Sequence, residues 1–444
     1  MIFSNMIKLL FLGNTLLFLM ATPSLALVPT ALHPPSSRNA FCLQGPGSIN
    51  ALMASTETAD GSSTRAPPRT GFAQTLLNFA LESPLWKLIL VPQARATMVK
   101  TAEANEIPWT AAKEWIKKQV PLSELEDELK KAKSQSIPPY YQKSFHAYET
   151  GNLNWDAAFE VEIASSAVGA RNFPEYGSKG EDAFRGSFES ALIDGDARVP
   201  TKEGRSETDD PILIVDFGCG TGMSTRRLAK SFPQADSIIG IDLSPFFISI
   251  GKKLLELTPS SFHEGGPWVS NIESDSRIEY FVGDVAKASK VKELDGLKGK
   301  ADVVNLQFVL HELPPDAARD IVDEAFRLLK LNGQLWICEM DFEAPAYAAQ
   351  RANPLLFSLI RSTEPYLDEY AESITDLFSY IRGKSPFVKV VPATGRHFAL
   401  VATKGPLDDG VQNVMQDLRF DEDGNYRVED THLPTFFELE SENK

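Results

Sequence analysis

Cysteine is scarce in this chain of 444 residues, which contains only three. Cys42 lies in a segment with the composition of a presequence, Cys219 in a glycine-rich loop, and Cys338 in a predicted core strand. Three thiols in such different places form neither a disulfide framework nor a zinc-binding pattern. We therefore expect a reduced, intracellular type of protein that holds no metal.

Positive charge is also in deficit, with 44 Lys and Arg residues against 60 Asp and Glu residues and a net charge of -16. Nucleic acids bind to basic surfaces, so this balance disfavours them as partners, although a local basic patch stays open. The hydrophobic content of 43% and charged content of 23% are ordinary for a soluble globular protein. The length allows one large domain with additions, or two domains.

The sequence near the N-terminus lacks an apolar run long enough to cross a membrane comfortably. The run Leu9–Met20 is interrupted by Gly, Asn and Thr, and a small-x-small cleavage signal follows at Ser24–Ala26. We expect residues 1–26 to be a signal peptide and the mature protein to have no stable membrane span.

Acidic residues are missing from the next segment until Glu57. Residues 27–70 are rich in Ser, Thr, Pro, Ala and Arg, the composition of a transit peptide. A signal peptide followed by a transit peptide resembles the two-part presequences of algae with secondary plastids. The expected location is therefore the plastid (chloroplast), with plain secretion as the alternative.

Three regions follow the presequence. Residues 71–200 carry apolar residues at helical spacing and predict a helical N-terminal cap, and residues 405–444 form an acidic C-terminal tail. Strands and helices alternate over residues 201–404, which indicates βαβ units and a parallel sheet. One predicted helix, Pro315–Leu331, is expected to stop at Asn332-Gly333. The predicted strands are Pro211–Asp216, Ser237–Asp242, Arg277–Val282, Asp302–Gln307, Gln334–Met340, Phe387–Val391 and Phe398–Thr403.

A glycine-rich loop follows the first of these strands. The acid Asp216 leads into the Gly-x-Gly-x-Gly pattern of residues 218–222, and a helical pattern then begins at Met223. Glycines let the backbone turn sharply and come close to a ligand. The dinucleotide fingerprint needs its third glycine one residue later, which disfavours a nicotinamide dehydrogenase. The loop predicts a pocket for a small molecule with a charged amino acid end and a nucleoside.

Further polar residues end the second, fourth and fifth predicted strands. Asp242 can accept hydrogen bonds from both hydroxyls of a ribose, although it could instead cap the helix that begins near Pro245. His311 can accept a proton from a substrate, or His311 and Glu312 only fix their loop. Glu339 and Asp341 are predicted substrate ligands, because open α/β sheets bind ligands at this edge, although they could instead bond a loop backbone.

With these motifs in place, the chain resembles class I S-adenosylmethionine (SAM)-dependent methyltransferases. The resemblance implies a Rossmann-like, seven-stranded α/β sheet with SAM as cofactor. It also implies roles for His311 and Glu312 in catalysis. The residues that it places at the cofactor are Asp216, Gly218, Cys219, Gly220, Gly222, Asp242, Leu243, Asp284, Val285 and Gln307.

An aromatic stretch upstream, residues 145–155, is similar to segments of uncharacterised plastid methyltransferases of plants and algae. Its His146 and Tyr148 are predicted to contact substrate, with aromatic packing as the alternative. We expect methyl transfer from SAM to oxygen or carbon of a small organic acceptor. A SAM-binding regulatory protein without catalysis, a protein methyltransferase and a nicotinamide oxidoreductase remain the alternatives, and the oligomeric state stays open.

Overall fold

The computed structural model describes residues 91–120, 129, 137–146, 148–203, 210–256, 275–352, 357, 363–406 and 414–427. All of these belong to a single unit of the chain. The predicted signal peptide and transit-like segment, residues 1–70, lie outside the described residues.

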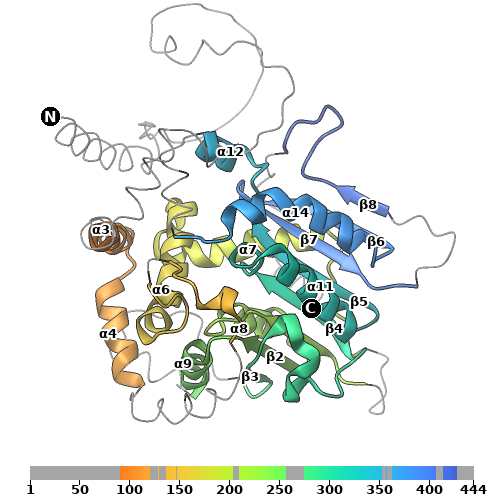
Figure 1. Ribbon diagram of the computed structural model, residues 1–444, viewed down its shortest axis with the longest axis horizontal. Helices are drawn as coiled ribbons and strands as arrows, with labels where there is room; N and C mark the ends of the chain where they lie inside the picture. The colour runs from red at the N-terminus through yellow and green to blue at the C-terminus, as the bar shows by residue number, and fades with distance from the viewer. Residues whose placement is uncertain are drawn as a thin grey trace, which may run out of the picture. The chain divides into compact units, whose positions relative to one another are not determined.

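One mixed sheet with the strand order β3-β2-β1-β4-β5-β7-β6-β8 forms the centre of this unit (Figure 1). The pairs β1/β2, β2/β3, β1/β4 and β4/β5 are parallel, while β7 is antiparallel to both β5 and β6. The strands are β1 (Leu213–Phe217), β2 (Ser237–Asp242), β3 (Ile278–Val282), β4 (Ala301–Gln307), β5 (Leu329–Met340), β6 (Phe387–Ala393), β7 (His397–Thr403) and β8 (Val414–Asp417).

The chain runs from β1 to β2 and β3 on one side, and β4 and β5 then continue on the other side of β1. This reversal creates a crevice at the carboxyl ends of β1 and β4, where open α/β sheets bind ligands. The predicted α/β class is confirmed, and the glycine-rich loop lies at this crevice.

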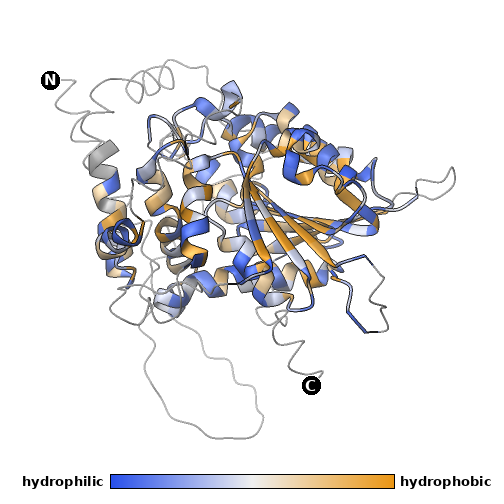
Figure 2. Ribbon diagram, turned by 90° about the horizontal axis from the view of Figure 1, so that it is seen from below, coloured by the Kyte–Doolittle hydropathy of each residue, from blue (hydrophilic) through white to orange (hydrophobic). Residues whose placement is uncertain are grey.

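Hydrophobic strands are covered by helices on both faces (Figure 2). Ile214 packs in a core with α7 (Gly180–Asp194) and α8 (Met223–Ser231). Its neighbour Val215 packs in a second core with α11 (Pro315–Leu328) and α14 (Leu367–Arg382), because successive strand side chains point to opposite faces. The remaining helix at this sheet, α9 (Pro245–Glu256), joins a third core.

The predicted cap segment contains α3 (Val91–Ala104), α4 (Trp109–Gln119) and α6 (Trp155–Asn172) besides α7. Buried polar contacts join α6 to α8 and to the glycine loop. Glu162 accepts hydrogen bonds from Arg226 at 2.7 Å and from the Thr221 hydroxyl at 2.8 Å. All three side chains are buried, so the position of α6 and that of the loop depend on one another.

Two predictions about the sheet were wrong. The helix before β5 ends at Leu328, and Asn332-Gly333 lies inside β5. Asn332 has a φ of 66°, and its N–H bonds to Lys404 O at 2.7 Å, so the dipeptide bends a strand instead of stopping a helix. The sheet also has an eighth strand, β8, parallel to β6 in the predicted tail. Its alternation covers only four residues, too few to stand out in the sequence.

Arg419 anchors the segment after β8 to the sheet. Its guanidinium pairs with buried Asp341 at 3.0 Å and with Asp417 at 2.7 Å, and it lies over the ring of Phe378. Both Arg419 and Asp341 are buried, so neither has water as a substitute partner.

Replacing Arg419 by methionine should lower the free energy of unfolding by about 3–5 kcal/mol, since it leaves Asp341 buried without its cation. Urea denaturation of the wild type and of Arg419→Met measures this. The control is Asp417→Asn, which breaks the more exposed ion pair and should cost about 1 kcal/mol or less. Equal losses for both variants would contradict the anchoring role.

Candidate active site

The glycine-rich loop has left-handed backbone at three positions, with φ of 69° at Gly218, 57° at Gly220 and 98° at Gly222. A Cβ at Gly218 would overlap Val309, and a Cβ at Gly222 would overlap the Tyr280 hydroxyl. At Gly220 it would meet nothing within 4 Å. The outer glycines are thus required by the fold, whereas Gly220 faces open space that a ligand can approach closely.

The carboxylate of Asp216 is fully buried beneath the loop. It accepts hydrogen bonds from Ser224 at 2.6 Å, Thr225 at 2.7 Å and Asn305 at 2.7 Å. Burial raises the pKa of Asp216, and these hydrogen bonds oppose the rise. Asp216 therefore ties the start of α8 to β4 and sets the position of the loop, which is also held by buried Cys219.

Asp242 lies at the end of β2 and faces the loop. Its carboxylate accepts hydrogen bonds from Gly220 N at 2.9 Å and from Ser244 N at 2.7 Å. Burial raises the pKa of Asp242 to about 6, against the effect of these hydrogen bonds. The helix α9 is capped by the Ser244 hydroxyl, which accepts from Phe247 N, so capping is not the task of Asp242. Leu243 is buried beside it.

Asp284 follows β3 at the same edge of the sheet. It accepts a hydrogen bond from Ala286 N at 3.1 Å and caps a 3₁₀ turn, η4 (Val285–Lys290). Val285, the first residue of that turn, is buried. The loop, Asp242 and Asp284 thus follow three adjacent strands, as the predicted cofactor site requires.

Two tyrosines that the sequence analysis did not assign to the site lie over these acids. The short turn η2 (Pro139–Gln142) brings the Tyr141 hydroxyl to 3.3 Å from Asp242 and the Tyr140 hydroxyl to 3.4 Å from Asp284. Burial raises the pKa of Tyr141 well above its usual value, so its hydroxyl stays protonated and donates a hydrogen bond to Asp242. A Pro-Pro-Tyr-Tyr sequence indicates a helix stop, and nothing in it reveals partners about a hundred residues away.

His311 and Glu339 form a buried pair beside the loop. Nδ1 of His311, in η6 (Leu310–Glu312), lies 2.9 Å from a Glu339 oxygen, and Glu339 also accepts from Leu310 N at 2.9 Å. Burial lowers the pKa of His311, but the charge and hydrogen bond of Glu339 outweigh it and raise the pKa to about 9. Glu339, a predicted substrate ligand, orients the ring of His311 through Nδ1. It does not engage the other ring nitrogen, Nε2.

Glu312 and His146 complete the titratable groups near His311. Glu312 accepts a hydrogen bond from Asn152 Nδ2 at 3.0 Å, and burial raises the pKa of Glu312 to about 7. His146 has a φ of 49° and its Nε2 lies 3.1 Å from Glu364. Partial burial lowers the pKa of His146, whose side chain is half exposed, yet the charge of Glu364 raises that pKa overall.

Two predicted substrate ligands have their polar atoms turned to other parts of the protein. The Tyr148 hydroxyl donates to Glu160 in the cap, and Asp341 is held by Arg419 and by the Tyr426 hydroxyl at 2.9 Å. Gln307, predicted at the cofactor, accepts a hydrogen bond from Arg185 of α7, a residue that the sequence analysis did not single out.

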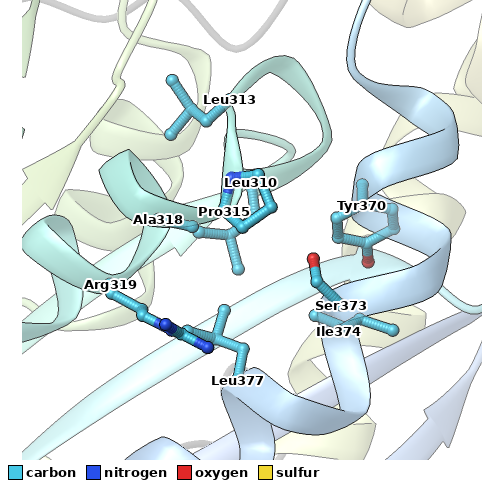
Figure 3. Close-up of a pocket in the computed structure, with 9 residues that line it drawn as sticks. All are labelled: Leu310, Leu313, Pro315, Ala318, Arg319, Tyr370, Ser373, Ile374 and Leu377. Atoms are coloured by element: carbon cyan, nitrogen blue, oxygen red, sulfur yellow. The ribbon is translucent and has the colours of Figure 1, made fainter.

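A small depression between η6, α11 and α14 lies outside this cluster of acids. It is mainly apolar, with Leu310, Pro315 and Leu377 in its walls and the Tyr370 and Ser373 side chains at one side (Figure 3). Its volume of about 10 Å³ has room for a single water at most. We therefore look for the ligand site at the sheet edge and not here.

Comparison with known proteins fits this geometry. Residues 215–335 match the methyltransferase domain family. The segment includes the whole glycine loop, Asp242, Asp284, His311 and the strands that these acids and this histidine follow. The match confirms the predicted class for this domain, a SAM-dependent methyltransferase, and its cofactor.

Curated relatives align with part of the chain. Malonyl-[acyl-carrier protein] O-methyltransferase of Halalkalibacterium halodurans is 32% identical over 131 residues, which are 30% of this chain and 40% of that protein. An uncharacterised methyltransferase of Emericella nidulans is 29% identical over 147 residues, or 33% of this chain and 47% of that protein. The chain thus spans less than half the length of these relatives.

Solved structures give a weak likeness. An O-methyltransferase family protein from Burkholderia thailandensis is 16% identical, with 64% of this chain and 69% of that chain covered and a TM-score of 0.36. A score this low supports no conclusion about function.

Within the described residues, no group of three or more His, Cys, Asp or Glu side chains is arranged to hold a metal ion. Of the helices in the described ranges, none combines the length and the apolar character that crossing a bilayer requires.

Proposed function

We propose that this protein transfers the methyl group of SAM to oxygen or carbon of a small organic acceptor. One observation carries the proposal. At one edge of the sheet, Gly220 faces open space and donates its N–H to Asp242, and the His311–Glu339 pair lies beside them. The family match over residues 215–335 supports it.

The residues at the edge fit such a cofactor. The space over Gly220 admits close approach to the backbone, and Asp242 offers a carboxylate to ribose hydroxyls. Asp284 and Val285 lie where the purine is expected. Tyr140 and Tyr141, which now donate to these two acids, would shield the bound nucleoside from water.

When bound, SAM supplies an activated methyl group, so the chain itself has to align the acceptor, exclude water and remove a proton where the acceptor holds one. Glu339 fixes the ring of His311, and in the unprotonated imidazole Nε2 accepts the proton of an acceptor hydroxyl or acidic carbon. Glu312, whose pKa lies near 7 because burial raises it, lies close enough to His311 to influence this step.

The His311–Glu339 pair favours an enzyme over a SAM-binding regulatory protein. Burying an imidazole against a carboxylate is costly and is not needed to bind a nucleoside at β2 and β3. Perturbed pKa values of this kind cluster at catalytic sites. A protein acceptor is the remaining alternative, and the buried position of His311 favours a small molecule, which can enter a narrow site.

Asp242→Ala should weaken binding of S-adenosylhomocysteine, measured by calorimetry, by about fivefold to 150-fold. This corresponds to about 1–3 kcal/mol for losing hydrogen bonds to a buried charge. The matched control is Asp302→Ala. Asp302 is equally buried and accepts from Leu213 N at 2.9 Å, but it lies at the opposite, amino-terminal edge of the sheet.

Asp302→Ala should lose stability and keep its affinity for S-adenosylhomocysteine. If Asp242→Ala keeps the wild-type affinity, or both variants lose it equally, Asp242 does not hold the cofactor and the proposed site is wrong.

We further propose that the protein acts in a plastid, with residues 1–70 as the targeting segment. The support is the composition of residues 27–56, which follow a signal-like run, contain no acid and are rich in Ser, Pro and Ala. A fluorescent protein fused behind residues 1–70 should enter the plastid of an alga with secondary plastids, and a fusion of residues 1–26 alone should be secreted. Secretion of both fusions would contradict the proposal.

A further inference from the structure

Two arginines at the carboxyl edge of the sheet have no acidic partner. Among the described residues, neither Arg171 nor Arg396 donates a side-chain hydrogen bond or forms an ion pair, although the chain has an excess of acids. The buried guanidinium groups of Arg226 and Arg419 each have an acidic partner. By contrast, Arg171 is exposed and Arg396 is half-buried. Unpaired guanidinium groups near a ligand site are candidates for binding an anion.

The hairpin between β6 and β7 places Arg396 at this edge. Thr394 and Gly395 have left-handed φ of 59° and 66° in the three-residue turn 394–396, and a Cβ at Gly395 would meet open space. The next residue, His397, pairs with Met340 at the carboxyl end of β5. Arg396 therefore lies next to the strand that carries Glu339.

Arg171 comes from the last turn of α6 and is exposed. Two residues on, Phe173 packs on Phe184, with ring centroids 6.4 Å apart, and Phe184 lies 5.3 Å from His397. This chain of rings brings the end of α6 to the hairpin.

An aromatic surface connects these arginines to His311. The ring of Phe308 lies 6.5 Å from His311 and 5.3 Å from His397, and the ring of Tyr347 lies 5.8 Å from His397. Phe308 and Tyr347 are half-buried and so offer a free face. Phe308 has a φ of 58°, a strained conformation for a bulky residue that is typical of functional sites.

We propose that Arg171 and Arg396 bind an anionic group of the acceptor, a carboxylate or a phosphate, while its apolar body lies on Phe308 and Tyr347 with the methylated atom toward His311. The inference rests on the proposed function, because it describes the acceptor of the same site. The guanidinium forks match the paired oxygens of both anions. His397 adds no charge, since burial lowers its pKa to about 3.

The test compares 4-hydroxybenzoate and phenyl phosphate with phenol, titrated into the full chain and followed by ligand-observed NMR. The wild type should bind at least one of the two anions about tenfold more tightly than phenol, as expected for charge-assisted hydrogen bonds. The double variant Arg171→Met/Arg396→Met should bind that anion no better than phenol. The control Arg319→Met, which removes an exposed arginine on α11, should keep the preference.

Equal binding of anions and phenol by the wild type, or an unchanged preference in the double variant, overturns the inference. If the wild type prefers only phenyl phosphate or only 4-hydroxybenzoate, the result identifies the anionic group of the acceptor as a phosphate or as a carboxylate. If the double variant does not fold, competition decides: inorganic phosphate should displace the bound anion from the wild type, and failure to do so overturns the inference. S-adenosylhomocysteine is titrated in a separate experiment. Its failure to bind would contradict the proposed function, whereas the binding of the anions would still test the role of the two arginines.

Discussion

Alanine at Gly220 is expected to weaken S-adenosylhomocysteine binding by about fivefold to 150-fold, because the added methyl group fills the space that the cofactor needs, an overpacking cost of about 1–3 kcal/mol. The protein should still fold. The left-handed backbone at Gly220 should lower the free energy of unfolding of the alanine variant by about 1 kcal/mol, and no neighbouring atom lies within 4 Å of the new Cβ.

Gly296→Ala is the matched control, since Gly296 has a φ of 80° and equally open surroundings but lies in the loop before β4. Both variants should lose a similar amount of stability in thermal denaturation, and only Gly220→Ala should lose the cofactor in calorimetry. Gly222→Ala should behave differently, because its Cβ overlaps Tyr280 and the variant should be destabilised. Wild-type affinity in a folded Gly220→Ala would place the cofactor elsewhere.

Removal of the His311 imidazole should lower kcat by about 10²- to 10⁴-fold, the usual contribution of a general base, with little change in cofactor affinity. His311→Ala is measured in methyl transfer from radiolabelled SAM to an acceptor from a plastid extract. Unchanged turnover would return His311 to a purely structural role. A loss of cofactor binding of the same size would do so too.

The pH profile tests the same base through Glu339. A base must be unprotonated, and Glu339 raises the pKa of His311 to about 9, so activity of the free enzyme should rise with pH toward that value. Glu339→Gln removes the charge that raises the pKa, and the midpoint of the profile should move to lower pH. A midpoint that stays in place would show that another group limits the reaction.

The free energy of unfolding should also depend on the protonation of His311. Unlike the activity, it should fall as the pH rises. The pKa of His311 is higher in the folded protein than its usual 6.5, so its proton stabilises the fold fully below pH 6.5. That contribution is lost as the pH rises through about 9. In urea denaturation the wild type should lose this increment between the two pH values, while Glu339→Gln should not.

The parts of the site that lie close together in sequence could be predicted from it. The glycine loop and the strand Ser237–Asp242 each carry their signal within a few residues, a short apolar run followed by an acid or by glycines. Since parallel strands bring their carboxyl ends to one edge, their meeting was predictable as well.

Residues that reach the site from distant elements could not be found in this way. Tyr141 meets Asp242 across 101 positions, and Asn152 meets Glu312 across 160. Such contacts depend on how the cap packs on the sheet, which no local pattern encodes. Arg171 and Arg396 were missed for the same reason, since each is an ordinary polar residue at the end of an element.

Local signals also misled where tertiary pairing overrode them. Asn332-Gly333 carries the composition of a helix stop, yet the hydrogen bonds with Lys404 keep it within β5. Asp341 ends a strand at the ligand edge, yet Arg419 from the predicted tail takes its carboxylate. In both cases the partner comes from the C-terminal part of the chain, which the motifs of the domain do not include.

A crystal structure of the chain with S-adenosylhomocysteine bound tests the central claim most directly. We expect the nucleoside against Gly220, its ribose hydroxyls on Asp242, and the Tyr141 hydroxyl moved from that carboxylate. An empty site at saturating concentration of this ligand, or the same site filled by a nicotinamide nucleotide in its place, would contradict the account.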